Sequence, residues 1–219
     1  MTKPATPGRA GLAGWPVNLV VEGRRVVVVG AGRVAARKIE SLLDLGADVM
    51  VVAPRVDGAV RRLVSDPSRG RVDLAEREYV DADLDGAWLV VTATDDPSVN
   101  ASVARAAEAA RIWCNSADDP DNCSFTLMSV VRRADLVVAI GSGGRSPALA
   151  SWLKRHVQEE MGPEYATLLD LLSEAREAMR GEGRATSDAD WQRAFESGIV
   201  ELVRSGRIAE AKELLSSCL

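Results

Sequence analysis

Apolar runs alternate with amphipathic stretches through the first half of the chain. Strands are expected at Val17–Val21, Arg25–Val29, Asp48–Ala53, Arg71–Arg77, Ala87–Thr94 and Ile112–Asn115. The intervening residues 32–45, 56–65 and 97–111 have helical spacing, and Asp96 followed by Pro97 is a typical helix start. Strands that are almost wholly apolar are typical of a parallel sheet covered on both faces. The pattern therefore predicts an α/β fold with a doubly wound parallel sheet of the Rossmann type and right-handed crossovers.

The pattern changes after residue 115. Two apolar runs, Phe125–Val131 and Leu136–Ile140, are joined so tightly that they should pair as an antiparallel hairpin. From Pro147 the chain reads as helical, with breaks at glycines. We expect a flexible leader at 1–14, a dinucleotide-binding domain at 15–115, a hairpin segment at 116–150 and a helical domain at 151–219. The hairpin has little core of its own, which predicts completion by a second subunit.

Composition narrows the function classes. Hydrophobic residues make up 47% of the 219 residues and charged residues 27%, as in ordinary globular proteins. The net charge of -5 weighs against general nucleic-acid binding. Three cysteines without a CxxC pair suggest neither a disulfide framework nor a structural zinc site. With no signal peptide and no membrane span in the sequence, the chain is expected to be cytoplasmic, with reduced thiols and no membrane partner.

A glycine-punctuated turn follows the second predicted strand. Residues 30–35, "GAGRVA", fit the pattern G-x-G-x-x-G/A. Gly30 permits the tight turn, Gly32 lets the backbone approach a pyrophosphate, and Ala35 is small enough for helix–strand packing. The position between a buried strand and a helix favours dinucleotide binding over a turn that binds nothing.

The acidic residue that often holds the cofactor ribose is missing. It should lie at the end of the third predicted strand, where the chain reads "VVAPR" over residues 51–55. Three explanations are open: backbone groups hold the ribose, Arg55 faces a 2′-phosphate and the cofactor is NADP, or the ligand is not a dinucleotide.

Five stretches together resemble a known family. They are "WPVNLVVEGRRVVVVGAGRVAARK" (15–38), "VVAP" (51–54), "VVTATDDPSVN" (90–100), "CNSADDPDNCSF" (114–125) and "VVRRADLVVAIGSGGRSPALA" (130–150). In this order the chain resembles the siroheme synthase N-terminal family of precorrin-2 dehydrogenases and sirohydrochlorin ferrochelatases. The resemblance implies a Rossmann domain, a dimerisation segment and helices in an intertwined homodimer. It also implies NAD as cofactor, bound without the usual acidic residue.

The resemblance also implies site residues. The positions that match the family's cofactor contacts, together with the loop glycines, are Gly30, Gly32, Arg33, Val34, Arg55, Val56 and Thr94. Two catalytic residues are implied: the family's catalytic aspartate corresponds to Asp118, and a serine of its glycine-rich loop corresponds to Ser142. From the residues alone, Asp118 in "DDPDN" is better explained as part of a turn, and only the resemblance favours catalysis.

The implied substrate, precorrin-2, is a tetrapyrrole with eight carboxylates. Arg132, Arg133 and Arg145 are candidates to hold these carboxylates, although the first two could equally be hairpin-turn charges in solvent. The sequence thus predicts NAD-dependent dehydrogenation of precorrin-2 to sirohydrochlorin. Alternatives are a bifunctional enzyme that also inserts Fe²⁺ or Co²⁺, an NAD-sensing regulatory domain, and a dimerisation scaffold. No protein metal site is expected, since His156 is the only histidine.

Overall fold

The computed structural model describes residues 14–218 and divides the chain into two compact units. The first unit ends at Leu127, and the second begins at Met128. Of the predicted leader at 1–14, only Gly14 is among the described residues. The predicted boundaries at residues 115 and 150 stay a prediction.

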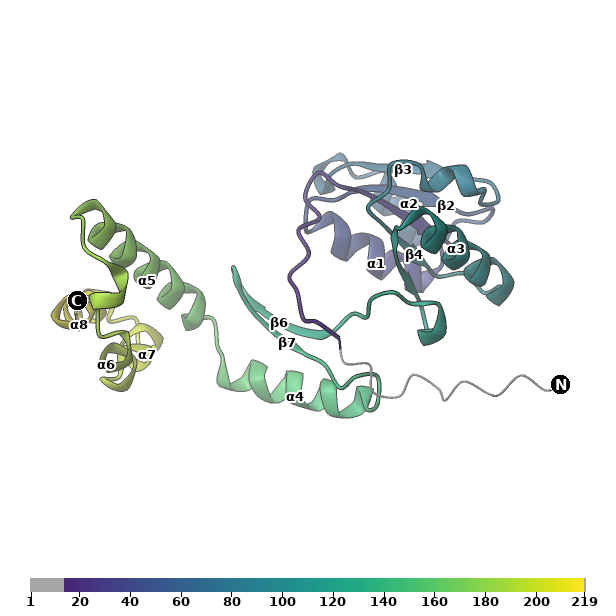
Figure 1. The fold of residues 1–219 in the computed structure, drawn as a ribbon. Helices are drawn as coiled ribbons and strands as arrows, with labels where there is room; N and C mark the ends of the chain where they lie inside the picture. The colour runs from purple at the N-terminus through teal and green to yellow at the C-terminus, as the bar shows by residue number, and fades with distance from the viewer. Residues whose placement is uncertain (1–13, 219) are drawn as a thin grey trace. The chain divides into compact units, whose positions relative to one another are not determined.

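One parallel sheet forms the centre of the first unit (Figure 1). Its strand order is β3-β2-β1-β4-β5 over the described residues, which confirms the predicted doubly wound α/β sheet. The elements are, in chain order, β1 (Arg25–Val29), α1 (Arg33–Leu43), β2 (Asp48–Val52), α2 (Gly58–Val64), η1 (Pro67–Arg69), β3 (Val72–Ala75), η2 (Asp81–Leu84), β4 (Leu89–Thr92), α3 (Pro97–Ala110), β5 (Trp113–Ser116) and η3 (Pro120–Asn122).

The valines of β1 serve two separate cores. Val26 and Val28 pack with the buried side chains of α1 and α2 on one face of the sheet. Val27 and Val29 pack with those of α3 on the other face. All four valines are almost completely buried. Because successive side chains of a strand point to opposite faces, this run places helices on both sides of the sheet and holds the loop after β1 rigidly.

The predicted strand at Val17–Val21 is wrong. These residues have no regular secondary structure, and Val17 and Val20 are about two-thirds exposed. Among the described residues no neighbouring strand pairs with this segment, since the sheet begins at Arg25. An apolar run alone does not supply the backbone partners that a strand needs.

A partly buried ion pair stabilises the segment that connects β3 and β4. The Asp83 carboxylate accepts hydrogen bonds from Arg77 Nη1 and Nη2 at 2.8 and 2.5 Å, and from the Val80 amide at 2.9 Å. The Arg77 guanidinium and the Val80 amide together hold the pKa of Asp83 below its usual range.

We expect Asp83→Asn to reduce stability in a pH-dependent way. The folded-state pKa lies below the unfolded value of about 3.9, so the carboxylate stabilises the fold above that pH and loses this effect as the pH falls further. Urea unfolding at several pH values should show a difference between wild type and Asp83→Asn that is constant near neutrality and shrinks below about pH 4. A difference that grows in acid would contradict this expectation.

The second unit contains a hairpin and helices, as predicted. Its elements are β6 (Ser129–Arg133), β7 (Leu136–Ile140), α4 (Pro147–Glu160), α5 (Glu164–Gly181), η4 (Thr186–Asp188), α6 (Trp191–Glu196), α7 (Ile199–Arg204) and α8 (Ile208–Cys218). The two strands pair antiparallel, with Ser129 opposite Ile140. A separate core joins α5 to α8, with Leu168, Leu171 and Ile199 buried at its centre.

Candidate functional site

The glycine loop lies at the carboxyl edge of the parallel sheet. Gly30 has φ +109°, a backbone conformation that side chains rarely adopt. Its amide donates to the Val52 carbonyl at 2.9 Å. A Cβ added at Gly30 would lie 2.4 Å from the Ala93 carbonyl oxygen. The loop therefore passes so close to the ends of β2 and β4 that only glycine fits.

Gly32 leaves open space above the start of α1. It is the N-cap of this helix, and no side chain caps the described helix start. A Cβ added there would have no heavy atom within 4 Å. The first amides of a helix have no partner within the helix, and together with the helix dipole they favour an anion. The first turn carries Arg33 and no acidic residue. These groups fit the pyrophosphate of a dinucleotide.

The loop after β2 packs against the glycine loop. The Asp57 amide donates to the Ala31 carbonyl at 2.9 Å, and the Asp57 carboxylate accepts from the Ala59 amide at 2.8 Å. At the position where an acidic residue would hold a ribose, Ala53 is buried, while Arg55 is exposed. Val56 is partly buried against the core. The structure thus places Arg55 and Val56 beside Gly30 and Gly32, without a free carboxylate at the end of β2.

Thr94 lies beyond β4, next to Gly30. Its hydroxyl donates to Asn100 Oδ1 at 2.8 Å, and Asn100 Nδ2 donates to the Thr94 carbonyl at 3.2 Å. Asn100 belongs to α3 and is buried, so Thr94 is tied to the helix that follows it. Thr94 and Gly30 thus lie at the same edge of the sheet. Val34, in the first turn of α1, is exposed.

Asp118 lies on a turn at this edge. The strand order places β4 between β1 and β5, and the Ala117 amide donates to the Thr92 carbonyl at 2.9 Å. Neighbouring strands are about 4.8 Å apart, so the turn after β5 is about 10 Å from the loop after β1. Asp118 is exposed and has φ +58°, which aspartate and asparagine tolerate better than most residues. The turn predicted from "DDPDN" therefore presents its carboxylate to solvent beside the glycine loop.

The Cys123 thiol holds the Asp118 turn in shape. Cys123 Sγ accepts from the Ser116 amide at 3.2 Å and lies 3.3 Å from the carbonyl oxygens of Ser116 and Asp119, to which it can donate. Burial raises the pKa of this thiol, so it stays protonated near neutral pH. Its sulfur thus connects the end of β5 with the residue after Asp118.

Cys123→Ala should loosen this turn. We expect a loss of about 1–2 kcal/mol in the free energy of unfolding, because the Ser116 amide loses its partner. Cys123→Ser restores a donor and acceptor and should lose less than half as much. Urea unfolding followed by tryptophan fluorescence measures both changes. Equal stability of the alanine variant and wild type would refute a role for the thiol.

Lys38 is a residue near the site that the sequence did not single out. It lies on α1 and is half-buried. Burial lowers its pKa, and the negative charge of Asp118 acts in the opposite direction. Lys38 is therefore close enough to Asp118 to feel its charge. Nothing in the helical pattern distinguishes it from Arg37, which is exposed.

The other predicted site residues belong to the second unit. Ser142 Oγ accepts from the Ser146 amide at 3.1 Å, in the loop before α4. Arg145 and Arg132 are exposed. Arg133 Nε donates to the Met161 and Gly162 carbonyls at 2.8 and 3.2 Å, so its guanidinium closes the end of α4. The roles of Ser142 and of the three arginines stay predictions.

Two classes of site are absent from residues 14–218. There is no group of three or more histidine, cysteine, aspartate or glutamate side chains that could hold a metal ion. No described helix is long and apolar enough to cross a bilayer.

Comparison with known proteins identifies similar sequences and folds. The model of a family described as putative NAD(P)-binding matches residues 17–129. Siroheme synthase of Pseudomonas aeruginosa is 38% identical over 206 residues, which cover 93% of this chain and 44% of that protein. Siroheme synthase of Azotobacter vinelandii is 35% identical over 204 residues, covering 91% and 43%. The chain thus spans less than half the length of these relatives.

A solved structure has a similar fold. It is that of SirC, a precorrin-2 dehydrogenase, with a TM-score of 0.72 and 24% sequence identity. The similarity covers 94% of this chain and 98% of that chain, so the hairpin and helices of the second unit are included.

Proposed function

This chain belongs to the putative NAD(P)-binding family, and on that basis we propose that it is an NAD-dependent dehydrogenase that oxidises precorrin-2 to sirohydrochlorin. The observation that carries the proposal is the carboxyl edge of the sheet. There the open space at Gly32 and the exposed carboxylate of Asp118 lie two strands apart. The names of the relatives, siroheme synthase and precorrin-2 dehydrogenase, support the tetrapyrrole as substrate.

Different residues of the first unit bind the cofactor and remove the proton. Bound NAD⁺ supplies the hydride acceptor. The α1 amides and Gly32 would hold its pyrophosphate, and Thr94 lies at the same edge of the sheet. Oxidation of precorrin-2 removes a hydride and a proton, and the Asp118 carboxylate takes the proton as general base. The Asp118 carboxylate is exposed, so a substrate can reach it from solvent. The turn that carries it is held in shape by Cys123.

The second unit contributes substrate contacts and a partner subunit. Arg132 and Arg145 are both exposed and bind carboxylates of the substrate. Ser142 belongs to the same unit and contributes to catalysis. The chain forms a homodimer through this unit. Its described sheet has only two strands, and Leu149 and Trp152 of α4 are about half exposed, which supports a covering partner. Light scattering coupled to gel filtration should give twice the mass of one chain. Three buried free cysteines support the cytoplasmic location.

Anaerobic turnover of precorrin-2 tests the function. With NAD⁺ present, we expect the tetrapyrrole spectrum to change to that of sirohydrochlorin, with one NADH formed per product. An unchanged spectrum, with the chain shown to bind NAD⁺, would reject the dehydrogenase in favour of the NAD-sensing alternative. Adding Fe²⁺ or Co²⁺ to the product tests the bifunctional alternative, since metal insertion changes the spectrum again.

A further inference from the structure

Lys38, on α1, lies close to the turn that carries Asp118. Phe125, in the segment that follows this turn, packs against the core that contains Ala35 of α1. The negative charge of Asp118 raises the pKa of Lys38, and the charge of Lys38 lowers the pKa of the Cys123 thiol, in each case against a larger effect of burial. Both effects place the ammonium group beside this turn.

The Lys38 ammonium group has no partner within the described part of the chain. No hydrogen bond or ion pair holds it there, although the side chain is half-buried. Partial burial of an unpaired charge costs free energy, and for this reason burial lowers the pKa of Lys38. An apolar side chain of the same length would stabilise the fold better. The position therefore suits an anionic partner that a ligand supplies.

The Lys38 side chain leans toward the carboxyl edge of the sheet. Helix α1 begins at this edge, directly after Gly32, and helical side chains tilt toward the N-terminus of their helix. The Lys38 Cα lies about 7.5 Å along the axis from the first residue of α1, and its side chain is long and unbranched. The ammonium group thus extends toward the edge where the exposed Asp118 carboxylate lies.

We propose that Lys38 binds a carboxylate of the tetrapyrrole substrate beside Asp118. The proposal rests on the proposed function, which identifies the substrate. Precorrin-2 has eight carboxylates, and an ammonium group donates charge-assisted hydrogen bonds to a carboxylate. This carboxylate takes no part in the bond changes, so the contact contributes equally to the bound substrate and to the transition state. Lys38 is therefore a substrate-binding residue of the first unit, and Asp118 remains the base.

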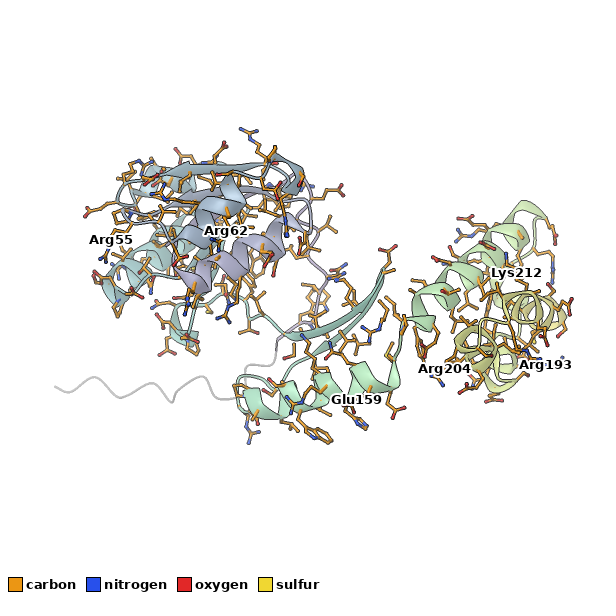
Figure 2. The ribbon with its side chains drawn as sticks, turned by 180° about the vertical axis from the view of Figure 1, so that it is seen from behind. Arg55, Arg62, Glu159, Arg193, Arg204 and Lys212 are labelled. Atoms are coloured by element: carbon orange, nitrogen blue, oxygen red, sulfur yellow. The ribbon has the colours of Figure 1, made fainter. Side chains whose placement is uncertain are left out.

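Arg37 provides a matched control. It is the neighbouring residue on α1, it is exposed, and among the described residues no hydrogen bond or ion pair holds its guanidinium. Successive residues of a helix are rotated by about 100° around the axis. Arg37 lines the groove between α1 and α2 together with Arg62, which Figure 2 labels on α2. Arg37→Met thus removes the same charge from another side of the same helix.

Anaerobic steady-state kinetics of the full chain test the proposal. We expect Lys38→Met to raise the KM for precorrin-2 about tenfold, with a turnover number and an NAD⁺ affinity within about twofold of wild type. Sirohydrochlorin keeps the carboxylates of precorrin-2, so its affinity, measured by quenching of tryptophan fluorescence, should fall by the same factor. Lys38→Arg retains the charge and should recover most of the affinity, and Arg37→Met should bind like wild type.

Thermal unfolding separates a binding role from a structural one. Lys38→Met should unfold at the same temperature as wild type or higher, because methionine has a similar length and no charge to bury. A lower unfolding temperature together with weaker binding would assign Lys38 to the fold and overturn the proposal.

The kinetic outcomes separate this proposal from the proposed function. A wild-type KM in Lys38→Met, or an equal rise in Arg37→Met, overturns the proposal for Lys38 while the dehydrogenase proposal stands. A Lys38→Arg variant as weak as Lys38→Met also overturns it, because the charge then does not bind the substrate. If wild type binds NAD⁺ but does not oxidise precorrin-2, the proposed function falls, and the role of Lys38 falls with it.

Discussion

Asp118→Asn is expected to lower the turnover number for precorrin-2 oxidation by about 100-fold or more, because a general base in the transition state contributes about 10²–10⁴-fold to rate. Asparagine accepts the φ of +58° at this position, so the turn should keep its shape. Since Asp118 lies about two strands from the glycine loop, the affinity for NAD⁺ should not change. Stopped-flow absorbance under anaerobic conditions gives the rate, and calorimetry gives the affinity.

Asp121→Asn is the matched control for Asp118→Asn. It removes an exposed carboxylate three residues further along the same segment, and the described structure shows no hydrogen bond or ion pair at that side chain. Its turnover should stay close to wild type. If Asp118→Asn also turns over normally, Asp118 is a turn residue only, as the residues alone suggested. An equal loss in both variants would point to the net charge of the turn.

Gly30→Ala should cause the largest loss of stability, about 3 kcal/mol. A methyl group there meets the Ala93 carbonyl oxygen at 2.4 Å, and alanine is strained at φ +109°. Strain at such a φ and overpacking against a fixed backbone each cost about 1–3 kcal/mol. Urea unfolding should show a lower midpoint, and wild-type stability would contradict the close approach described here.

Gly32→Ala separates binding from folding at the same loop. Its φ of -84° is ordinary, and the added methyl group meets no protein atom within 4 Å. We expect stability within about 0.5 kcal/mol of wild type. The affinity for NAD⁺ should fall about tenfold or more, because the methyl group occupies the space that a pyrophosphate needs. Unchanged affinity would place the dinucleotide elsewhere.

Local pattern was enough to predict the sheet, because each of its strands is a buried apolar run. The valines of β1 predicted the strand, and the glycines after them predicted the loop. The same rule failed at Val17–Val21, where the run is apolar but no neighbouring strand supplies hydrogen bonds. Whether an apolar run forms a strand depends on its packing against another segment, and the run itself does not reveal that packing.

The site was only partly visible in the sequence. Gly30 and Gly32 follow from a spacing, whereas the proximity of Lys38 to Asp118 depends on how α1 lies relative to the turn after β5. Arg133 is predicted at a hairpin turn or on a substrate, and nothing in the sequence indicates that its guanidinium bonds to a carbonyl 28 residues further along the chain. In the same way, Arg33 and Arg62 come to line one groove only because α1 and α2 pack together.

The burial of the Cys123 thiol at the turn after β5 affects how easily the protein is oxidised. Peroxide attacks the thiolate form of cysteine, and both Cys123 and Cys114 are buried with a raised pKa, that of Cys114 to about 11. Neither sulfur is an easy target while the chain is folded. Purification in air should therefore leave the loop intact without added reductant, and an intact-mass measurement after mild peroxide treatment should find these two thiols unmodified.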